Sequence, residues 1–225
     1  MSTLLPVIAV AGAIALGAMS PGPSFVMVVR TAVARSRRDG LAAALGMGAG
    51  GAIFAALALL GLTAALAGVA WLYLGLKVLG GAYLLYLAYR IWRGAREPLD
   101  LGAPAGESAG EGGRAGPARS FPAQSFPGRS FLLGLTTQLS NPKTAIFYAS
   151  VFAALLPRGA GPETALLLLP VIFALEAGWY AIVALAFSAR RPRQAYLRWK
   201  AWIDGLAGAV LAALGLRLMA DAVRP

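Results

Sequence analysis

One short stretch constrains the fold of this chain more than any other. The segment Ser20–Ser24, with the sequence Ser-Pro-Gly-Pro-Ser, interrupts a long apolar run that extends from Leu4 to Ala34. A continuous helix is disfavoured there, because Pro21 and Pro23 have no backbone N–H to donate. The whole run exceeds the ~20 residues that cross a hydrocarbon core. The pattern therefore predicts a transmembrane helix broken near mid-depth, which requires surrounding protein or a water-filled cavity.

A second break of the same kind lies in the other half of the chain. The sequence Ser-Asn-Pro-Lys at positions 140–143 interrupts another apolar segment. Breaks in corresponding positions of two halves are typical of the binding site of a transporter. The alternative, that both breaks are only structural kinks, stays open at this point.

Composition supports a membrane protein. Of 225 residues, 59% are hydrophobic and 13% charged, which is too few charges for an ordinary soluble domain. The net charge of +11 does not indicate nucleic-acid binding, since the arginines lie between apolar runs. Without cysteine or histidine the chain lacks thiolates and the usual general base, so we expect neither an enzyme nor a metal site or cofactor.

We predict an all-α integral membrane protein with six transmembrane helices, of which the first and fourth are broken. Residues 1–93 form the first three-helix half, 94–129 a flexible linker rich in Gly, Ala and Pro, and 130–225 the second half. The predicted spans are Leu4 to Ala34, Leu41 to Leu66, Val69 to Trp92, Phe131 to Leu156, Thr164 to Ala189 and Ala201 to Val223.

The two halves also resemble each other. A shift of 127 residues places Lys77 on Asp204, Gly81 on Gly208 and Arg90 on Arg217, whereas the breaks align at a shift of 120. Because each half has three spans, such repeats must be inverted in the membrane.

Basic residues predict the orientation. Fifteen flank the Arg35–Gly40 loop, the linker and the loop that begins at Arg190, against two on the other face. Since basic loops stay in the cytoplasm, the linker is expected to be cytoplasmic and both termini outside.

Several motifs together resemble one known family. Ser-Pro-Gly-Pro at 20–23, Leu-Gly-Gly-Ala-Tyr-Leu at 79–84, Leu-Ser-Asn-Pro-Lys at 139–143 and Asp-Gly-Leu-Ala-Gly-Ala at 204–209 resemble the LysE/RhtB (lysine exporter) family. The resemblance implies a six-span protein of the bacterial inner membrane that exports amino acids and related small molecules by using the proton gradient. The linker is longer and richer in Gly and Pro than is expected for that family.

Gly46–Gly51 matches the dinucleotide pattern G-x-G-x-x-G. A real site needs a preceding strand and a soluble βαβ unit. Here the motif lies in a transmembrane segment, so we interpret these glycines as a close helix-packing surface.

Ionisable residues inside the spans mark the candidate site, because charges at bilayer depth cost about 2.5–3.5 kcal/mol on insertion scales and usually face cavities or partners. Lys143 and Glu176 are expected near the centres of their spans, facing one cavity between the halves. Amides at the two half-helix starts and Lys143 would hold a carboxylate, and Glu176 an ammonium group or a proton. The candidate binding residues are Ser20, Pro21, Gly22, Pro23, Ser24, Ser140, Asn141, Pro142, Lys143 and Glu176, and the candidate coupling or intramembrane charges are Lys77, Glu176 and Asp204.

The expected function is secondary export of small amphoteric solutes, with a small-molecule amino acid as substrate, protons as coupling ion and the lipid bilayer as surroundings. A homodimer is one candidate assembly. Two alternatives remain: a divalent metal-ion exporter of a related superfamily, which the lack of His and Cys disfavours for soft metals, and a non-transporting membrane scaffold.

The orientation can be tested by labelling, because the chain has no natural cysteine. Single cysteines in the variants Ser36→Cys, Ser108→Cys and Gln194→Cys should resist an impermeant thiol reagent in intact cells, since all three positions are expected in the cytoplasm. Ready labelling of Ser108→Cys would overturn the orientation.

Overall fold

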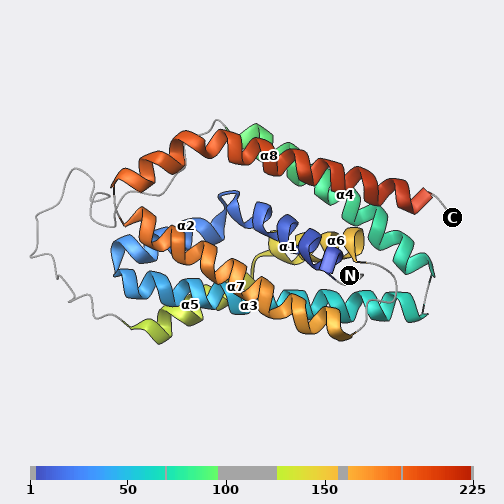
Figure 1. Cartoon of the computed structure of the whole chain (residues 1–225), viewed down its shortest axis with the longest axis horizontal. Helices are drawn as coiled ribbons and strands as arrows, with labels where there is room; N and C mark the ends of the chain where they lie inside the picture. Colours follow the sequence, from blue (N-terminus) through green and yellow to red (C-terminus); the bar gives the residue numbers. More distant parts are fainter. Residues whose placement is uncertain (1–3, 69, 96–125, 157–161, 189, 224–225) are drawn as a thin grey trace, which may run out of the picture.

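The computed structural model describes residues 4–68, 70–95, 126–156, 162–188 and 190–223, and almost all of them are helical (Figure 1). The expected linker lies mostly outside these residues. The helices of the described residues are α1 (Leu4–Met19), α2 (Pro23–Ala34), α3 (Arg37–Gly68), α4 (Ala70–Gly94), α5 (Pro127–Leu139), α6 (Pro142–Leu155), α7 (Pro162–Phe187) and α8 (Arg190–Val223).

The described helices include several that are long and apolar enough to cross a membrane. These are α3 over Arg37–Gly61, α7 over its full length, and α8 over Tyr196–Ala222. Helices α1 and α2 meet the same criterion as a pair bent by 61° at their break, which gives up to four membrane-spanning elements. The chain is therefore a helical membrane protein.

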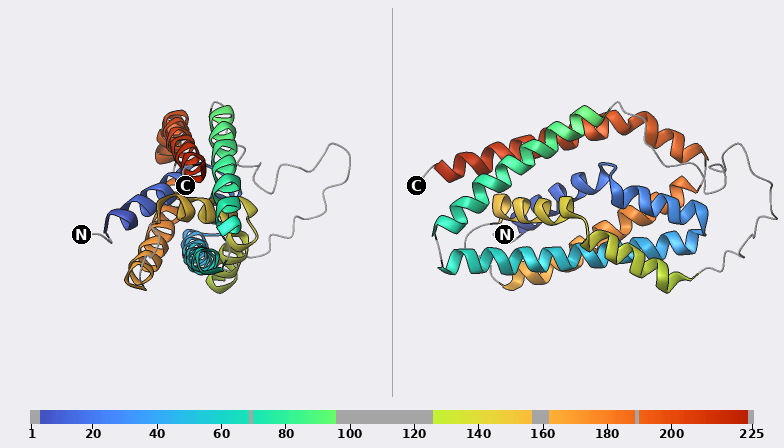
Figure 2. Two further views of the ribbon diagram at one scale, coloured as in Figure 1. Left: turned by 90° about the vertical axis from the view of Figure 1, so that its right-hand side faces the viewer. Right: turned by 180° about the vertical axis from the view of Figure 1, so that it is seen from behind.

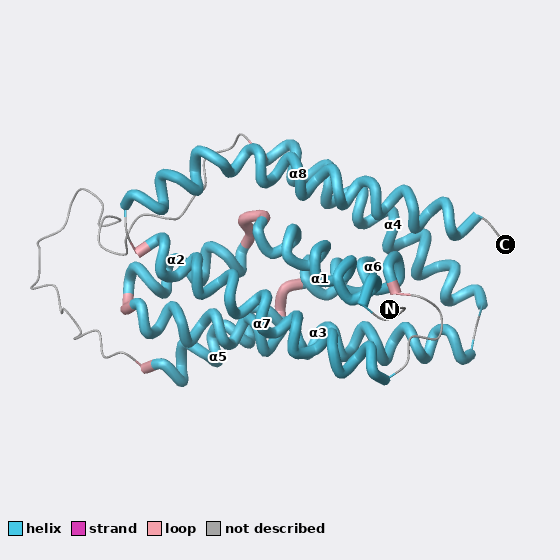
Figure 3. The backbone as a smooth tube through the Cα atoms, viewed as in Figure 1, coloured by secondary structure: helices cyan, strands magenta, loops and turns pink. Residues whose placement is uncertain are grey.

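Both expected breaks are present, near the middle of the molecule (Figure 3). Pro23 and Pro142 each occupy the first turn of the helix that follows, where a missing N–H costs nothing. The residues that precede them, Gly22 and Asn141, are the N-caps. The equivalent pairs are thus Gly22-Pro23 and Asn141-Pro142, one position away from the alignment of Ser20 with Ser140.

Helix α3 begins earlier than its predicted start at Leu41. Its first turn is capped by two reciprocal hydrogen bonds: the Asp39 N–H donates to Ser36 Oγ at 3.1 Å, and the Ser36 hydroxyl donates to Asp39 Oδ2 at 2.6 Å. This pairing satisfies the Asp39 amide, which has no partner within the helix, so the helix extends into the basic segment.

Helices α5 and α8 also begin earlier than predicted. Helix α5 starts at Pro127, inside the segment assigned to the linker, and α8 starts at Arg190, inside the segment assigned to a basic loop. In α8 the proline that suggested a loop, Pro192, lies in the first turn. Proline is compatible with the first turn of a helix, so it marks a start here and not an interruption.

The helices are arranged around a central group (Figures 1 and 2). Helices α4 and α8 pack along each other on one side, and α3 packs against α5 and α7 on the other. The shorter helices α1, α2 and α6 lie between them, so both breaks are located between the two outer groups of helices.

The glycines of α3 bring its neighbours to backbone contact, as expected for a packing surface. A Cβ on Gly46 would collide with the backbone of α5 at Phe131, and one on Gly48 would lie 2.8 Å from the Phe173 carbonyl oxygen of α7. From the other side, a Cβ on Gly134 of α5 would collide with the Ala43 carbonyl oxygen of α3. The Gly46–Gly51 motif therefore serves helix packing.

This packing predicts a stability difference between two glycine variants. Gly134→Ala should lower stability by about 1–3 kcal/mol, because the methyl group meets backbone that cannot move aside. Gly12→Ala should be neutral or stabilising, since nothing lies within 4 Å and alanine favours the helix. Thermal unfolding of the purified protein in detergent measures both, and equal midpoints would show that α3 and α5 are not in contact here.

Candidate functional site

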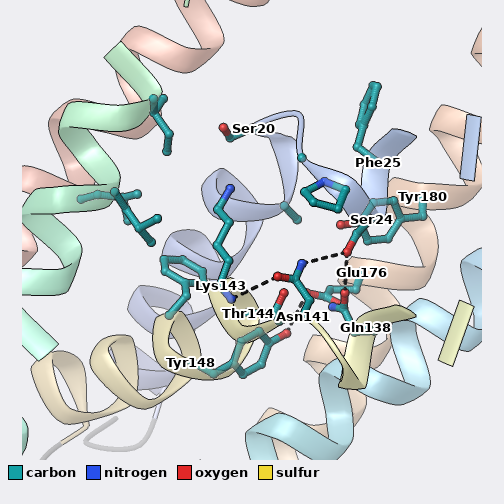
Figure 4. Close-up of a pocket in the computed structure, with 18 residues that line it drawn as sticks. Ser20, Ser24, Phe25, Gln138, Asn141, Lys143, Thr144, Tyr148, Glu176 and Tyr180 are labelled. Carbon is teal, nitrogen blue, oxygen red and sulfur yellow. Dashed lines mark hydrogen bonds between the residues drawn. The ribbon is translucent and has the colours of Figure 1, made fainter. Parts of the chain in front are cut away.

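A small closed cavity lies where the two breaks meet α7. Its volume is about 40 Å³, and its polar lining includes Ser20, Ser24, Gln138, Lys143, Tyr148 and Glu176 (Figure 4). A buried water needs roughly 10–15 Å³ by the same measure, so there is space for a few waters and not for an amino acid. We call this space the closed cavity, because it is too small for an amino acid.

Glu176 is the acidic residue of this cavity, and it is 3% exposed. The Tyr148 hydroxyl donates to its Oε1 at 2.8 Å, and the Gln138 side-chain amide donates to its Oε2. Gln138 ends α5 and Tyr148 lies in α6, so the two hydrogen bonds connect both sides of the second break to α7. Gly51 of α3 lies against the same carboxylate, where a Cβ would be 2.5 Å from Oε2.

Ser24 connects the two breaks directly. Its hydroxyl donates to Gln138 Oε1 at 3.1 Å, and the Asn141 amide donates to Ser24 Oγ at 3.2 Å. The first turn of α2 is therefore hydrogen-bonded both to the end of α5 and to the cap of α6 (Figure 4).

The two half-helix starts are not equivalent, which corrects the expectation that both offer free amides. At α6, the Lys143 N–H donates to Asn141 Oδ1 at 3.1 Å and the Thr144 N–H to the Asn141 carbonyl at 3.1 Å. At α2, the cap residue Gly22 has no side chain and makes no such bond. The start of α2 is thus the end available to an anion.

Lys143 lies in the same cavity as Glu176, but the two side chains are not paired. Figure 4 shows Lys143 extending toward the Ser20 side, away from the group formed by Glu176, Gln138 and Tyr148. Among the described residues its ammonium group makes no hydrogen bond or ion pair. It also reaches a second, wider cleft.

We call this second space the outer cleft. It has a volume of about 780 Å³ and lies between the α1–α2 break and helices α4 and α8. The charged and aromatic residues of its wall are Tyr83, Tyr86, Tyr89, Arg90, Arg93, Lys143, Lys200 and Asp204.

The other candidate residues have different positions. Ser140 and Pro142 are exposed and line an outer groove, and Pro21 lines the outer cleft. Lys77 lies far from the cavity, where its ammonium group donates to the Asp221 carbonyl at 3.1 Å. Asp204 is paired with Lys200 at 3.0 Å in the outer cleft. The structure therefore separates Lys77 and Asp204 from Glu176.

The polar residues of the site that the sequence analysis missed include Gln138, Tyr148 and Tyr180. Gln138 carried a usable signal, since it is a polar residue three positions before Asn141 and so shares a face of the chain leading into the break. Tyr148 lies within an apolar run, where a hydroxyl that reaches a partner on another helix leaves no pattern in the sequence.

These features define the class of protein. Helices long enough to span a membrane surround two breaks in the chain, and a polar charged cavity lies where these breaks meet, which is the arrangement of a membrane transport protein.

Comparison with known proteins identifies the family. A family model described as LysE type translocator matches residues 15–222, and the chain belongs to this family. It is a translocator and not an enzyme. The threonine efflux protein of Escherichia coli K12 is 36% identical over 202 residues, covering 89% of this chain and 91% of the relative. That of Salmonella typhi is 37% identical with the same coverage.

A more distant relative is an uncharacterized membrane protein of Haemophilus influenzae, which is 28% identical over 92% of both chains. No solved structure shows a significant match to the chain.

The hydrogen bond from Tyr148 to Glu176 predicts a loss of stability on Tyr148→Phe. The ring keeps its contacts with Phe54 and Phe152, but the buried carboxylate loses a donor, which should cost about 1–3 kcal/mol. Tyr83→Phe, on α4 and outside the cavity, is the matched control and should change stability little. The measurement is the unfolding midpoint in detergent, and a Tyr148→Phe midpoint equal to that of the control would contradict the bond.

Proposed function

We propose that this protein exports amino acids or related small amphoteric metabolites across the bacterial inner membrane, driven by the proton gradient. One observation carries the proposal: the open start of α2, Lys143 and the buried carboxyl of Glu176 line one cavity at the meeting of two broken helices. The names of the relatives as threonine efflux proteins support an amino-acid substrate.

The cavity chemistry matches both ends of a zwitterion. The substrate carboxylate would bind the Ser24 and Phe25 amides together with the Lys143 ammonium group, since a helix start favours negative charge. The substrate ammonium group would bind Glu176 after displacing one of its present donors. Because the closed cavity is too small for an amino acid, binding requires the two halves to move apart.

Glu176 is also the proposed proton carrier. Among the described residues it is the only acid that lines the cavity, and it is buried against Gln138, Tyr148 and Gly51. A carboxyl that binds either a proton or the substrate ammonium group couples proton transport to substrate transport, because only one of the two can occupy the carboxyl at a time.

The packing of α4 against α8 supports six spans arranged as two inverted repeats. A Cβ on Gly81 would meet Met219, and one on Gly208 would meet Trp92. The shift of 127 residues aligns Gly81 with Gly208 and Trp92 with Met219. The contact of Gly81 with Met219 therefore corresponds to the contact of Gly208 with Trp92. A two-fold axis between the halves has this property.

The polar contacts at the two ends of the α4–α8 pair are also related by the shift of 127 residues. At one end Lys77 donates to the Asp221 carbonyl at 3.1 Å, and at the other Lys200, paired with Asp204, donates to the Gly94 carbonyl at 2.8 Å. The shift of 127 relates Lys77 to Asp204 and Gly94 to Asp221. We therefore extend the proposal to alternating access, with the outer cleft on one side of the membrane.

A cleft at the opposite end corresponds to it. This space of about 370 Å³ is lined by Lys77, Arg217 and Asp221, which the shift relates to Asp204, Arg90 and Gly94 of the outer cleft. The outer cleft lies on the basic side of the molecule, which we place in the cytoplasm, so it admits substrate from the cytoplasm. The opposite cleft then releases the substrate outside. Helix α1 starts and α8 ends at the same end of the molecule, which supports placing both termini outside (Figure 1). A homodimer is compatible with this scheme but is not needed for it.

Nothing in the cavity favours the alternative of metal export. A divalent cation such as Ca²⁺ takes six to eight oxygen ligands, mostly from carboxylates and carbonyls. Among its described lining residues the cavity offers one carboxylate, and the same cavity holds a lysine ammonium group, which repels a cation.

The proposal predicts the effect of Glu176→Gln. The variant should insert and fold, because glutamine keeps the shape and can still accept from Tyr148, but gradient-driven export of L-threonine from proteoliposomes should fall to background. Lys143→Met should likewise lose export. The matched control is Glu163→Gln, which removes an exposed acid from the first turn of the same helix and should export normally.

Measuring counterflow separately from gradient-driven export distinguishes the two proposed roles of Glu176, substrate binding and proton coupling. If Glu176→Gln keeps counterflow and loses only gradient-driven export, Glu176 couples protons and does not anchor the substrate. Full gradient-driven export by Glu176→Gln would remove both roles.

A further inference from the structure

We propose that the outer cleft holds a second amino-acid site, in which Asp204 binds the substrate ammonium group and Lys143 its carboxylate. This inference rests on the proposed function, and it assigns the cleft a substrate of the same chemical class. The site would be occupied before the substrate enters the closed cavity.

The first observation is an incomplete hydrogen-bond set on Asp204. This residue is 2% exposed, and its Oδ2 accepts from Lys200 at 3.0 Å. Its Oδ1 is buried and makes no well-formed hydrogen bond among the described residues, and the Ser20 hydroxyl of the first break is the donor that lies close to this carboxylate. A buried carboxylate oxygen without a well-formed hydrogen bond is costly, and Asp204 lies in the wall of the outer cleft, where a ligand ammonium group would complete the set.

The second observation is the position of Lys143. Its side chain lines both the closed cavity and the outer cleft, and its ammonium group has no partner among the described residues. Lys143 and Asp204 face the same cleft closely enough to interact electrostatically, yet no ion pair joins them. The same cleft is thus lined by a cationic donor and an anionic acceptor that are not paired with each other, and a zwitterion could bind to both.

The surroundings of the gap favour a ligand that arrives with its carboxylate exposed. Arg90 and Arg93 of α4 and Lys200 of α8 make the cleft strongly basic, and Asp204 is the acidic residue in its wall. Positive potential in a cleft concentrates anionic groups, while the one carboxylate selects those that also carry an ammonium group. Its volume of about 780 Å³ also has room for an amino acid, unlike the closed cavity.

Because both sites use Lys143, the substrate would occupy the outer cleft first and the closed cavity second. The substrate carboxylate can stay on Lys143 while the ammonium group moves from Asp204 in the outer cleft to Glu176 in the cavity. Ser20, Gly22 and Pro23 of the first break line both spaces, so this break is the wall that must move during the transfer.

The test compares two variants that differ only in the carboxylate. Lys200→Gln and Lys200→Gln/Asp204→Asn both lack the ion pair, but the first keeps the acceptor for the ligand. In proteoliposome counterflow, competition by L-threonine is compared with competition by 3-hydroxybutyrate, which lacks the amino group. The preference for L-threonine should stay near the wild-type value in Lys200→Gln and fall by about tenfold in the double variant, as expected for one charged hydrogen bond. The double variant buries no unpaired charge and is expected to fold, whereas Lys200→Gln leaves Asp204 without its ion-pair partner, so the unfolding midpoints of both variants are compared with that of the wild type first.

A second measurement locates the ligand without changing Asp204. Tyr89→Cys places the chain's single thiol in the outer cleft, where Tyr89 is 57% exposed. L-threonine should slow its reaction with a thiol reagent, and should do so equally when Glu176→Gln is added, because only the inner site is altered. Arg38→Cys, exposed and outside the cleft, should react at the same rate with and without L-threonine.

The outcomes separate this inference from the proposed function. An unchanged preference in the double variant, or no protection of Tyr89→Cys, overturns the second site while wild-type export still supports the exporter. Protection by vesicles of anionic lipid but not by L-threonine also overturns it, and assigns the cleft to lipid headgroups. If the wild type exports no amino acid, the proposed function fails and the second site fails with it.

Discussion

The structure depends on one constraint: a helix broken at membrane depth exposes backbone groups that lipid cannot satisfy. At the second break the Asn141 side chain and carbonyl accept from the next amides, so the break is complete within its own segment. At the first break Gly22 provides no such cap. Ser24 joins the two breaks by hydrogen bonds to Gln138 and Asn141, and the open helix start therefore faces a polar cavity and not lipid.

The glycine-rich helix α3 follows from the same constraint. Hydrogen bonds from Gln138 and Tyr148 to Glu176 require α5, α6 and α7 to converge within a few ångströms, and α3 packs against all three. Only residues without a side chain permit that convergence, as Gly50 does against Gln138 and Gly51 against Glu176. Packing and site are thus one arrangement, since the helix surface that provides close contact also encloses the carboxylate.

The sequence predicted what depends on local backbone chemistry and on the cost of burying charge. The prolines located both breaks and the first turns of α2 and α6, and depth in an apolar span singled out Lys143 and Glu176. The sequence did not predict contacts between segments that lie far apart in the chain. Tyr148 bonds Glu176 through a fold that no periodicity records, and the Ser36–Asp39 cap moved the start of α3 into a segment that basic composition had assigned to a loop. The difference between the Gly22 and Asn141 caps was readable in principle, because only asparagine has a side-chain oxygen.

In the proposed inverted repeat, one pair of equivalent positions carries opposite charges, and this has a consequence for transport. Asp204 in the outer cleft corresponds to Lys77 in the opposite cleft. Under the proposed scheme, a zwitterion that enters with its ammonium group on Asp204 meets a lysine at the equivalent place on the exit side. Binding there in the same orientation is weaker, so the substrate leaves more readily than it returns. Such asymmetry changes the rates of entry and release but cannot change the equilibrium, because the two directions share one free-energy difference. In this scheme, net export against a concentration gradient would come from the proton coupling proposed for Glu176, while the unequal clefts would set the affinity on each side.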